Sequence, residues 1–176
     1  MLVWTLTVIG FATVWLEPNP FTIFILAAAS LGNASIMGHH IAHRSFDAVE
    51  GSPRRFNSQV FSNGYRRLFE WFDWIDMTSW KHEHNKLHHY SLGEDIDPDT
   101  PQDNAFWLRA LKIPFFLKIP FVILGSFVFK SVYFGPTSMN ELLNKEEGTR
   151  HSFYSLELWS PFRSRFWVVV RKCWLP

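Results

Sequence analysis

The sequence predicts an all-α protein embedded in a membrane, and three observations favour this fold class. Hydrophobic residues make up 47% of the 176 residues, and aromatic residues make up 18%. The first 43 residues contain no Lys or Arg and only one acidic residue, Glu17. Three stretches of the chain are long and apolar. An apolar, nearly uncharged start followed by a charged region is typical of a membrane anchor that precedes a solvent-facing part.

Residues 1–37 are expected to form a transmembrane helical hairpin. Residues 2–16 and 21–37 are both apolar, and Pro18 and Pro20 form a turn between them. Each stretch is slightly shorter than the ~20 residues of a spanning helix. A signal peptide is the alternative for the first stretch, but the basic start is missing and a second apolar segment follows directly.

Residues 66–80 interleave aromatic and acidic side chains. This pattern predicts one amphipathic helix at the membrane surface, with Trp71, Trp74 and Trp80 near the level of the lipid headgroups.

The C-terminal half has two further segments. Residues 105–135 are expected to associate with the membrane, either as a kinked span or as an in-plane helix. A clean span is disfavoured because Lys118 would cost about 3 kcal/mol at the bilayer centre. Residues 136–176 are expected to form a polar loop and then an apolar segment that stops short of a full span.

Charge and cysteine content exclude several classes of protein. The net charge is +1, so no broad basic field indicates binding to nucleic acid. The single cysteine, Cys173, excludes an internal disulfide framework and a cysteine-based metal site. Residues 44–112 contain nine Lys or Arg, whereas the turn at Pro18 has none, so residues 38–104 should form a cytosolic region.

Seven of the eight histidines lie between His39 and His89, and this clustering suggests a metal site. His39 and His43 are four residues apart, which places them on one face of a helix. His84 and His88 repeat this spacing, and His89 lies ~100° further round an α-helix. A site built almost wholly of imidazoles at a membrane surface suits iron, although zinc and copper also accept imidazole.

Two segments carry a resemblance to a known family. Residues 38–46 (GHHIAHRSF) resemble the first histidine box of the membrane fatty-acid desaturase and hydroxylase superfamily, and residues 80–89 (WKHEHNKLHH) resemble the second. The acidic stretch at residues 94–99 is similar to the one that follows the second box. The resemblance covers roughly residues 1–135.

The resemblance implies the ligands of two non-haem irons. They are His39, His43, His84, His88 and His89. His40 is expected beside the ligands or as an extra ligand, and Asp97 and Asp99 are expected to orient ligand imidazoles or to form a solvated loop. No catalytic residue apart from the metal ligands and no organic cofactor is expected.

The resemblance also implies the reaction, in which O₂ is used to introduce a double bond into a fatty acyl chain. The implied partners are membrane lipid, the acyl substrate, O₂, and an electron donor such as cytochrome b5 or ferredoxin with its reductase. The implied location is the endoplasmic reticulum, the bacterial inner membrane or the plastid, with the histidine boxes facing the cytoplasm.

The sequence departs from the family in one respect. The family has a third box, H-x-x-H-H, but here only His151 follows His89. We therefore expect an incomplete copy of such an enzyme. The alternatives are a hydroxylase of the same superfamily, which acts on alkyl, sterol or carotenoid substrates, and a non-catalytic membrane remnant.

Overall fold

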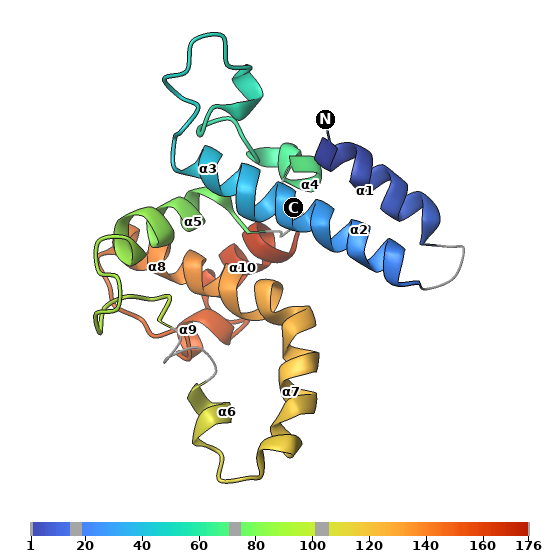
Figure 1. Ribbon diagram of the computed structural model, residues 1–176. Coiled ribbons are helices and arrows are strands. Elements are labelled where there is room, and N and C mark those ends of the chain that lie inside the picture. Colours follow the sequence, from blue (N-terminus) through green and yellow to red (C-terminus); the bar gives the residue numbers. More distant parts are fainter. Residues whose placement is uncertain (1, 15–18, 71–74, 101–105, 176) are drawn as a thin grey trace. The chain divides into compact units, whose positions relative to one another are not determined.

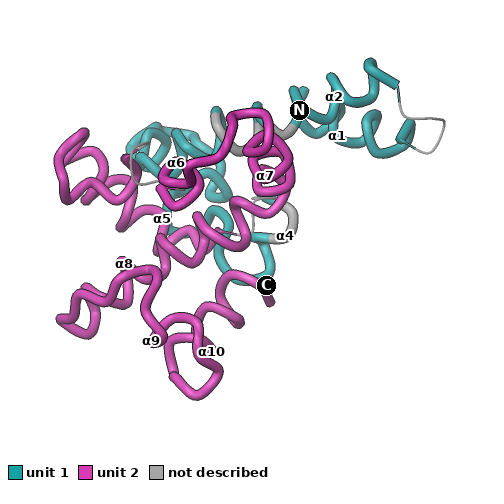
Figure 2. The backbone as a smooth tube through the Cα atoms, turned by 90° about the horizontal axis from the view of Figure 1, so that it is seen from below, with its two compact units in different colours: residues 1–73 teal, residues 74–176 magenta. Residues whose placement is uncertain are grey.

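The computed structural model describes residues 2–14, 19–70, 75–100 and 106–175. These residues form helices and loops and no strand, so the predicted all-α fold class is confirmed (Figure 1). The chain divides into two compact units, residues 1–73 and residues 74–176 (Figure 2). The first histidine box belongs to unit 1, and the second belongs to unit 2.

Unit 1 begins with two antiparallel helices, α1 (Leu2–Thr13) and α2 (Pro20–Leu31) (Figure 1). The side chain of Asn19 caps α2 by accepting a hydrogen bond from the backbone N–H of Thr22, at 2.9 Å. The two helices approach closely at Gly10, where an added Cβ would lie only 2.5 Å from Leu26. Insertion of this pair into a membrane stays a prediction.

Helix α2 continues without a break into the first histidine box. A π-helical segment, η1 (Gly32–Gly38), joins it to α3 (His39–Ala42). The box is thereby fixed at the end of an apolar helix, which is the position that the sequence predicts.

A long loop with three short helical turns completes unit 1. The turns are η2 (Arg54–Phe56), η3 (Gly64–Arg66) and α4 (Arg67–Glu70). Asp47 closes the loop because its carboxylate accepts hydrogen bonds from the backbone N–H and the hydroxyl of Ser58, at 2.7 and 2.8 Å.

The single amphipathic helix predicted for residues 66–80 is wrong. Helix α4 is described as far as Glu70, Ile75 and Asp76 are not helical, and a new helix, α5 (Met77–His82), begins after Asp76. Asp76 caps α5, because its side chain accepts hydrogen bonds from the backbone N–H groups of Thr78 and Ser79, at 3.1 and 3.2 Å. Trp80 is buried, not placed at a surface. Trp71 and Trp74 lie outside the described residues.

The main helix of unit 2 is a continuous run of 33 residues, Phe115–Glu147. It consists of α7 (Phe115–Val128), the π-helical segment η5 (Phe129–Phe134) and α8 (Gly135–Glu147), and a short helix, α6 (Phe106–Ala110), precedes it. Among the described residues it is the one helix long and apolar enough to cross a membrane. The side chains of its α7 part are largely exposed.

The polar loop predicted after Gly135-Pro136 is instead helix α8. Pro136 lacks a backbone N–H and cannot donate a helical hydrogen bond. It is tolerated because it stands at the first turn of α8, directly after the wide turn of η5. The hydroxyl of Thr137 donates to the carbonyl oxygen of Tyr133 at 2.7 Å and so satisfies a carbonyl near the junction. The helix bends between α7 and α8 (Figure 1).

The last apolar stretch packs within unit 2. Helices α9 (Leu156–Trp159) and α10 (Ser164–Val169) and the segment η6 (Val170–Trp174) pack on α8. The resulting core contains the following buried side chains: Met139, Leu143, Leu158, Val169 and Cys173.

A buried arginine joins α10 to α8. The Arg165 side chain is 3% exposed, and its guanidinium donates to the side-chain oxygens of Asn140 and Asn144 at 3.1 and 2.9 Å. It also donates to the carboxylate of Glu147 at 2.7 Å and to the hydroxyl of Thr149 at 2.6 Å. All of this donor capacity is used within unit 2, so a buried cation is tolerated here.

Replacing Arg165 with Met should destabilise unit 2 by about 3 kcal/mol, because the partner oxygens lose a buried, charge-assisted donor. Arg163→Met is the matched control, since Arg163 is largely exposed and its ion pair with Glu157 measures 3.4 Å. The control should cost at most about 1 kcal/mol. Thermal unfolding of the detergent-solubilised protein measures both changes, and equal losses would contradict the assigned role of Arg165.

Candidate metal centre

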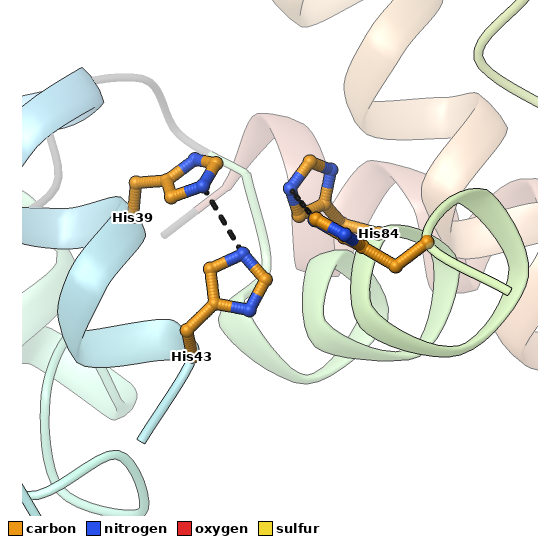
Figure 3. Close-up of side chains that lie close together, drawn as sticks. His39, His43 and His84 are labelled. Carbon is orange, nitrogen blue, oxygen red and sulfur yellow. Dashed lines mark hydrogen bonds between the residues drawn. The ribbon is translucent and has the colours of Figure 1, made fainter. Parts of the chain in front are cut away.

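The first histidine box brings the Nε2 atoms of two tilted imidazoles close together in unit 1. The backbone N–H of His43 donates to the carbonyl oxygen of His39 at 3.0 Å, which is an α-helical turn. The Nε2 atoms of the two rings lie 3.1 Å apart, and Figure 3 shows these nitrogens pointing toward one another. His40 is exposed, and its ring centroid lies 6.1 Å from that of His39.

The second box lies on a π-helical segment, η4 (Glu83–His88), that continues from α5. The backbone N–H of His89 donates to the carbonyl oxygen of His84 at 3.1 Å, five residues earlier. The wider turn brings the Nε2 atoms of His84 and His89 to 3.2 Å (dashed line at His84 in Figure 3). The rings of His84 and His88 are stacked, with centroids 5.1 Å apart.

This arrangement differs from the α-helical geometry expected from sequence. On an α-helix His84 would share a face with His88, and His89 would be turned away. On a π-helix the i, i+5 pair meets instead, so His89 faces His84. Single π-turns inside helices occur frequently at functional sites.

The nitrogen separations in both boxes match those of ligands on one metal ion. Two nitrogens bound at about 2.1 Å lie about 3.0 Å apart at a right angle and about 3.4 Å apart at the tetrahedral angle. The observed separations of 3.1 and 3.2 Å fall between these limits. Each pair either shares one N–H···N hydrogen bond or directs both lone pairs at one cation.

Asp97 holds the third imidazole of unit 2. The Nδ1 atom of His88 lies 2.9 Å from a carboxylate oxygen of Asp97. Asp97 is 3% exposed and also accepts hydrogen bonds from the backbone N–H groups of Gly93 and Asp99, at 3.0 and 2.9 Å. With Nδ1 donating to the carboxylate, the Nε2 of His88 keeps its lone pair for a metal.

Burial alone would raise the pKa of the Asp97 carboxyl. The hydrogen bonds from Gly93, Asp99 and His88 outweigh burial, and the pKa lies below its ordinary value. Asp97 is therefore a carboxylate at neutral pH.

Asp99 is a candidate donor in its own right. It offers one carboxylate oxygen to a group with His84 and His88, in which the three possible ligand atoms lie within 4.8 Å of one another. The sequence predicts that Asp99 either orients a ligand imidazole or lies in a solvated loop, and the structure adds the option of direct ligation.

Glu83 is a buried residue of the box that sequence reasoning missed. Its side chain is 1% exposed, and the hydroxyl of Ser138 on α8 donates to it at 3.3 Å. Burial and then the negative charge of Asp99 raise the pKa of Glu83 to about 8, so its carboxyl is mostly protonated at neutral pH. In the sequence, the one sign that Glu83 belongs to the site is its position directly before His84.

Two histidines lie apart from the candidate ligand groups of unit 2. The Nδ1 atom of His82 is buried without a hydrogen-bond partner among the described residues, and burial followed by Lys145 and Lys86 lowers the pKa of its imidazole. The backbone of His151 is bonded to the side chains of Asn140 and Asn144, and its ring joins no candidate ligand group in the described chain.

Paired imidazoles on helices and a carboxylate-bound histidine are the arrangement expected of a histidine-rich metal site. The family model "Fatty acid desaturase" matches residues 3–171, so the chain belongs to the fatty-acid desaturase family. The match extends well beyond the residues 1–135 that the boxes alone indicate. No curated protein and no solved structure gives a significant match.

The donor set fits the iron that this family implies. It offers neutral imidazole nitrogens and carboxylate oxygens, and both are ligands of non-haem iron. Each box presents its nitrogens at metal-ligand spacing within its own unit. That all five histidines serve one metal pair stays a prediction.

Replacing Asp97 with Asn should weaken metal binding about 10- to 100-fold, because the orienting charge on His88 is lost while an acceptor oxygen remains. Asp95→Asn is the matched control, since Asp95 is exposed on the same loop. Titration of the purified protein with Co²⁺, followed by its visible absorption, gives both affinities. Equal affinities for the two variants would show that Asp97 does not support a metal ligand.

Proposed function

We propose that this chain takes part in the O₂-dependent desaturation of fatty acyl chains, with two irons held by histidines. The observation that carries the proposal is the arrangement of imidazoles in the second histidine box, in a chain that belongs to the fatty-acid desaturase family. His84 and His89 direct their Nε2 atoms to one point, and Asp97 fixes His88 beside them. In this proposal the histidines hold the metal, and the metal, not a separate catalytic acid or base, supplies the chemistry.

The proposed ligands are the five box histidines: His39, His43, His84, His88 and His89. Bound iron would supply the activation of O₂ that removes hydrogen from an unactivated acyl C–H bond. Asp97 would keep one ligand in the correct tautomer and orientation, and His40 and Asp99 would stand beside the ligands or complete them.

The surroundings of the box suit a redox metal. The N-terminal cap at Asp76, the buried Trp80 and the contact between Glu83 and Ser138 fix the helix that leads into the second box. A fixed set of ligands needs little rearrangement when the charge of the metal changes.

The proposed setting is a membrane, with the boxes on the cytoplasmic side. Family membership and the long apolar helix Phe115–Glu147 support the membrane, and the distribution of Lys and Arg supports the sidedness. Electrons would come from cytochrome b5 or ferredoxin with its reductase, as in the family that the chain belongs to.

Five histidines leave positions on two irons open, so we expect the chain by itself to bind iron weakly and to form no new double bond. Fusing a third-box segment (H-x-x-H-H) of a family member after Pro176 should supply the missing ligands. We expect the fusion to produce a new double bond in a desaturase-deficient host, as measured by acyl-chain profiling.

The His84→Ala variant of the fusion should lose both activity and iron, whereas His151→Ala should keep both. Hydroxylated acyl chains would assign the fusion to the hydroxylase alternative. A fusion that binds two irons and yields neither product would contradict the proposed function. Stoichiometric iron and a new double bond from the chain alone would contradict the expected shortage of ligands.

A further inference from the structure

Unit 2 contains a partly open apolar cavity of about 650 Å³. Its walls come from α6, α7, η5 and the segment that leads into α9. Aromatic side chains dominate the lining, among them Trp107, Phe121, Phe129 and Phe153. The cavity is within the size range of small-molecule sites, which are usually concave and mostly apolar.

The cavity is separate from the candidate metal centre. None of its lining residues is a histidine, and none belongs to α5 or η4. An occupant of the cavity therefore does not touch the second box, and its role differs from that of an acyl chain held at the metal for reaction.

The cavity is partly open, and its walls are mostly apolar, so water inside it finds few hydrogen-bond partners. Covering such a wall with an apolar group removes apolar surface from water, which is favourable.

The surrounding helix indicates what fills the cavity. Helix α7 exposes large apolar side chains outside the cavity as well, such as Leu124 at 68% and Phe127 at 82%. A helix of this kind is surrounded by hydrocarbon in the proposed membrane setting, so lipid acyl chains are the nearest apolar ligands.

Three of the lining residues are of types that occur in the headgroup region of a bilayer. They are Lys130, Tyr133 and Tyr154, and Lys130 is exposed. Tyrosine and tryptophan are enriched where a bilayer meets water, and a lysine there attracts a lipid phosphate.

We propose that this cavity binds one acyl chain of a membrane phospholipid, with the phosphate near Lys130. The bound lipid is not consumed; it fills the space between α7 and the segment before α9 and so holds these parts of unit 2 together. The proposal rests on the proposed membrane setting and is independent of the desaturase reaction.

Gly125 provides a direct way to block the cavity. It lies in the lining, and a Cβ added at this position would meet no atom within 4 Å. The variant Gly125→Trp therefore adds a bulky side chain to the cavity lining at a position where its Cβ meets open space. Leu124→Trp is the matched control, because Leu124 precedes it on the same helix, is exposed and does not line the cavity.

The experiment uses the full chain in vesicles of phosphatidylcholine and phosphatidylglycerol that contain a phospholipid with a photoactivatable group on its acyl chain. After irradiation, mass spectrometry locates the labelled peptides. We expect labelling concentrated at α6, η5 and residues 153–159, lost in Gly125→Trp and kept in Leu124→Trp. Lys130→Gln should reduce labelling by the anionic phosphatidylglycerol probe more than by the phosphatidylcholine probe.

Several results would overturn the lipid site. Unchanged labelling in Gly125→Trp, or labelling spread evenly over the exposed faces of α7, would reduce it to general contact with the bilayer. Cross-linking of Gly125→Cys to a second copy of the chain, with protection from the lipid probe, would assign the cavity to a protein partner. Failure of the chain to enter vesicles at all would reject the membrane setting itself, and helix content by circular dichroism shows whether each variant is folded.

Discussion

The burial of Arg165 is the constraint on which unit 2 depends. A guanidinium that is almost fully removed from water must use its donors within the protein, and helix α8 provides most of the acceptors. The same helix presents Ser138 to Glu83 on the second box. Helix α8 therefore connects the C-terminal helices to the residue that directly precedes His84, so the packing of α10 and the orientation of the box are linked through one element.

The π-helical turn of the second box brings candidate ligand nitrogens close together. It brings the imidazoles five residues apart, His84 and His89, to 3.2 Å, while the rings of His84 and His88 stay stacked. His84 and His89 then share one point, and His88 becomes available to Asp97. A backbone turn of this kind is less favourable than an α-helical turn, and the contacts that α8 makes with the box supply compensating stability.

The sequence predicts the helical class and the two histidine boxes, because apolar stretches and histidine spacing are local signals. It does not predict the π-turn at residues 83–88, since hydrophobic periodicity does not reveal a widened turn. The sequence predicts a loop where α8 lies, because Gly135-Pro136 usually ends a helix, whereas here the proline stands at the first turn of α8. The break before Asp76 carries a readable signal, an aspartate followed by Thr78 and Ser79, typical of a helix start. The buried partnership of Glu83 with α8 joins residues far apart in sequence, and no local pattern shows it.

X-ray absorption spectroscopy of the iron-loaded chain tests imidazole ligation most directly, because it reports the atoms bound to the metal independently of turnover. The account predicts a nitrogen-rich first shell at about 2.1 Å with the outer-shell scattering of several imidazoles. That outer-shell signal should weaken in His89→Ala and stay unchanged in His151→Ala. A first shell of oxygens alone, or a spectrum that is the same in His84→Ala, His89→Ala and the unaltered chain, would contradict ligation by the second histidine box.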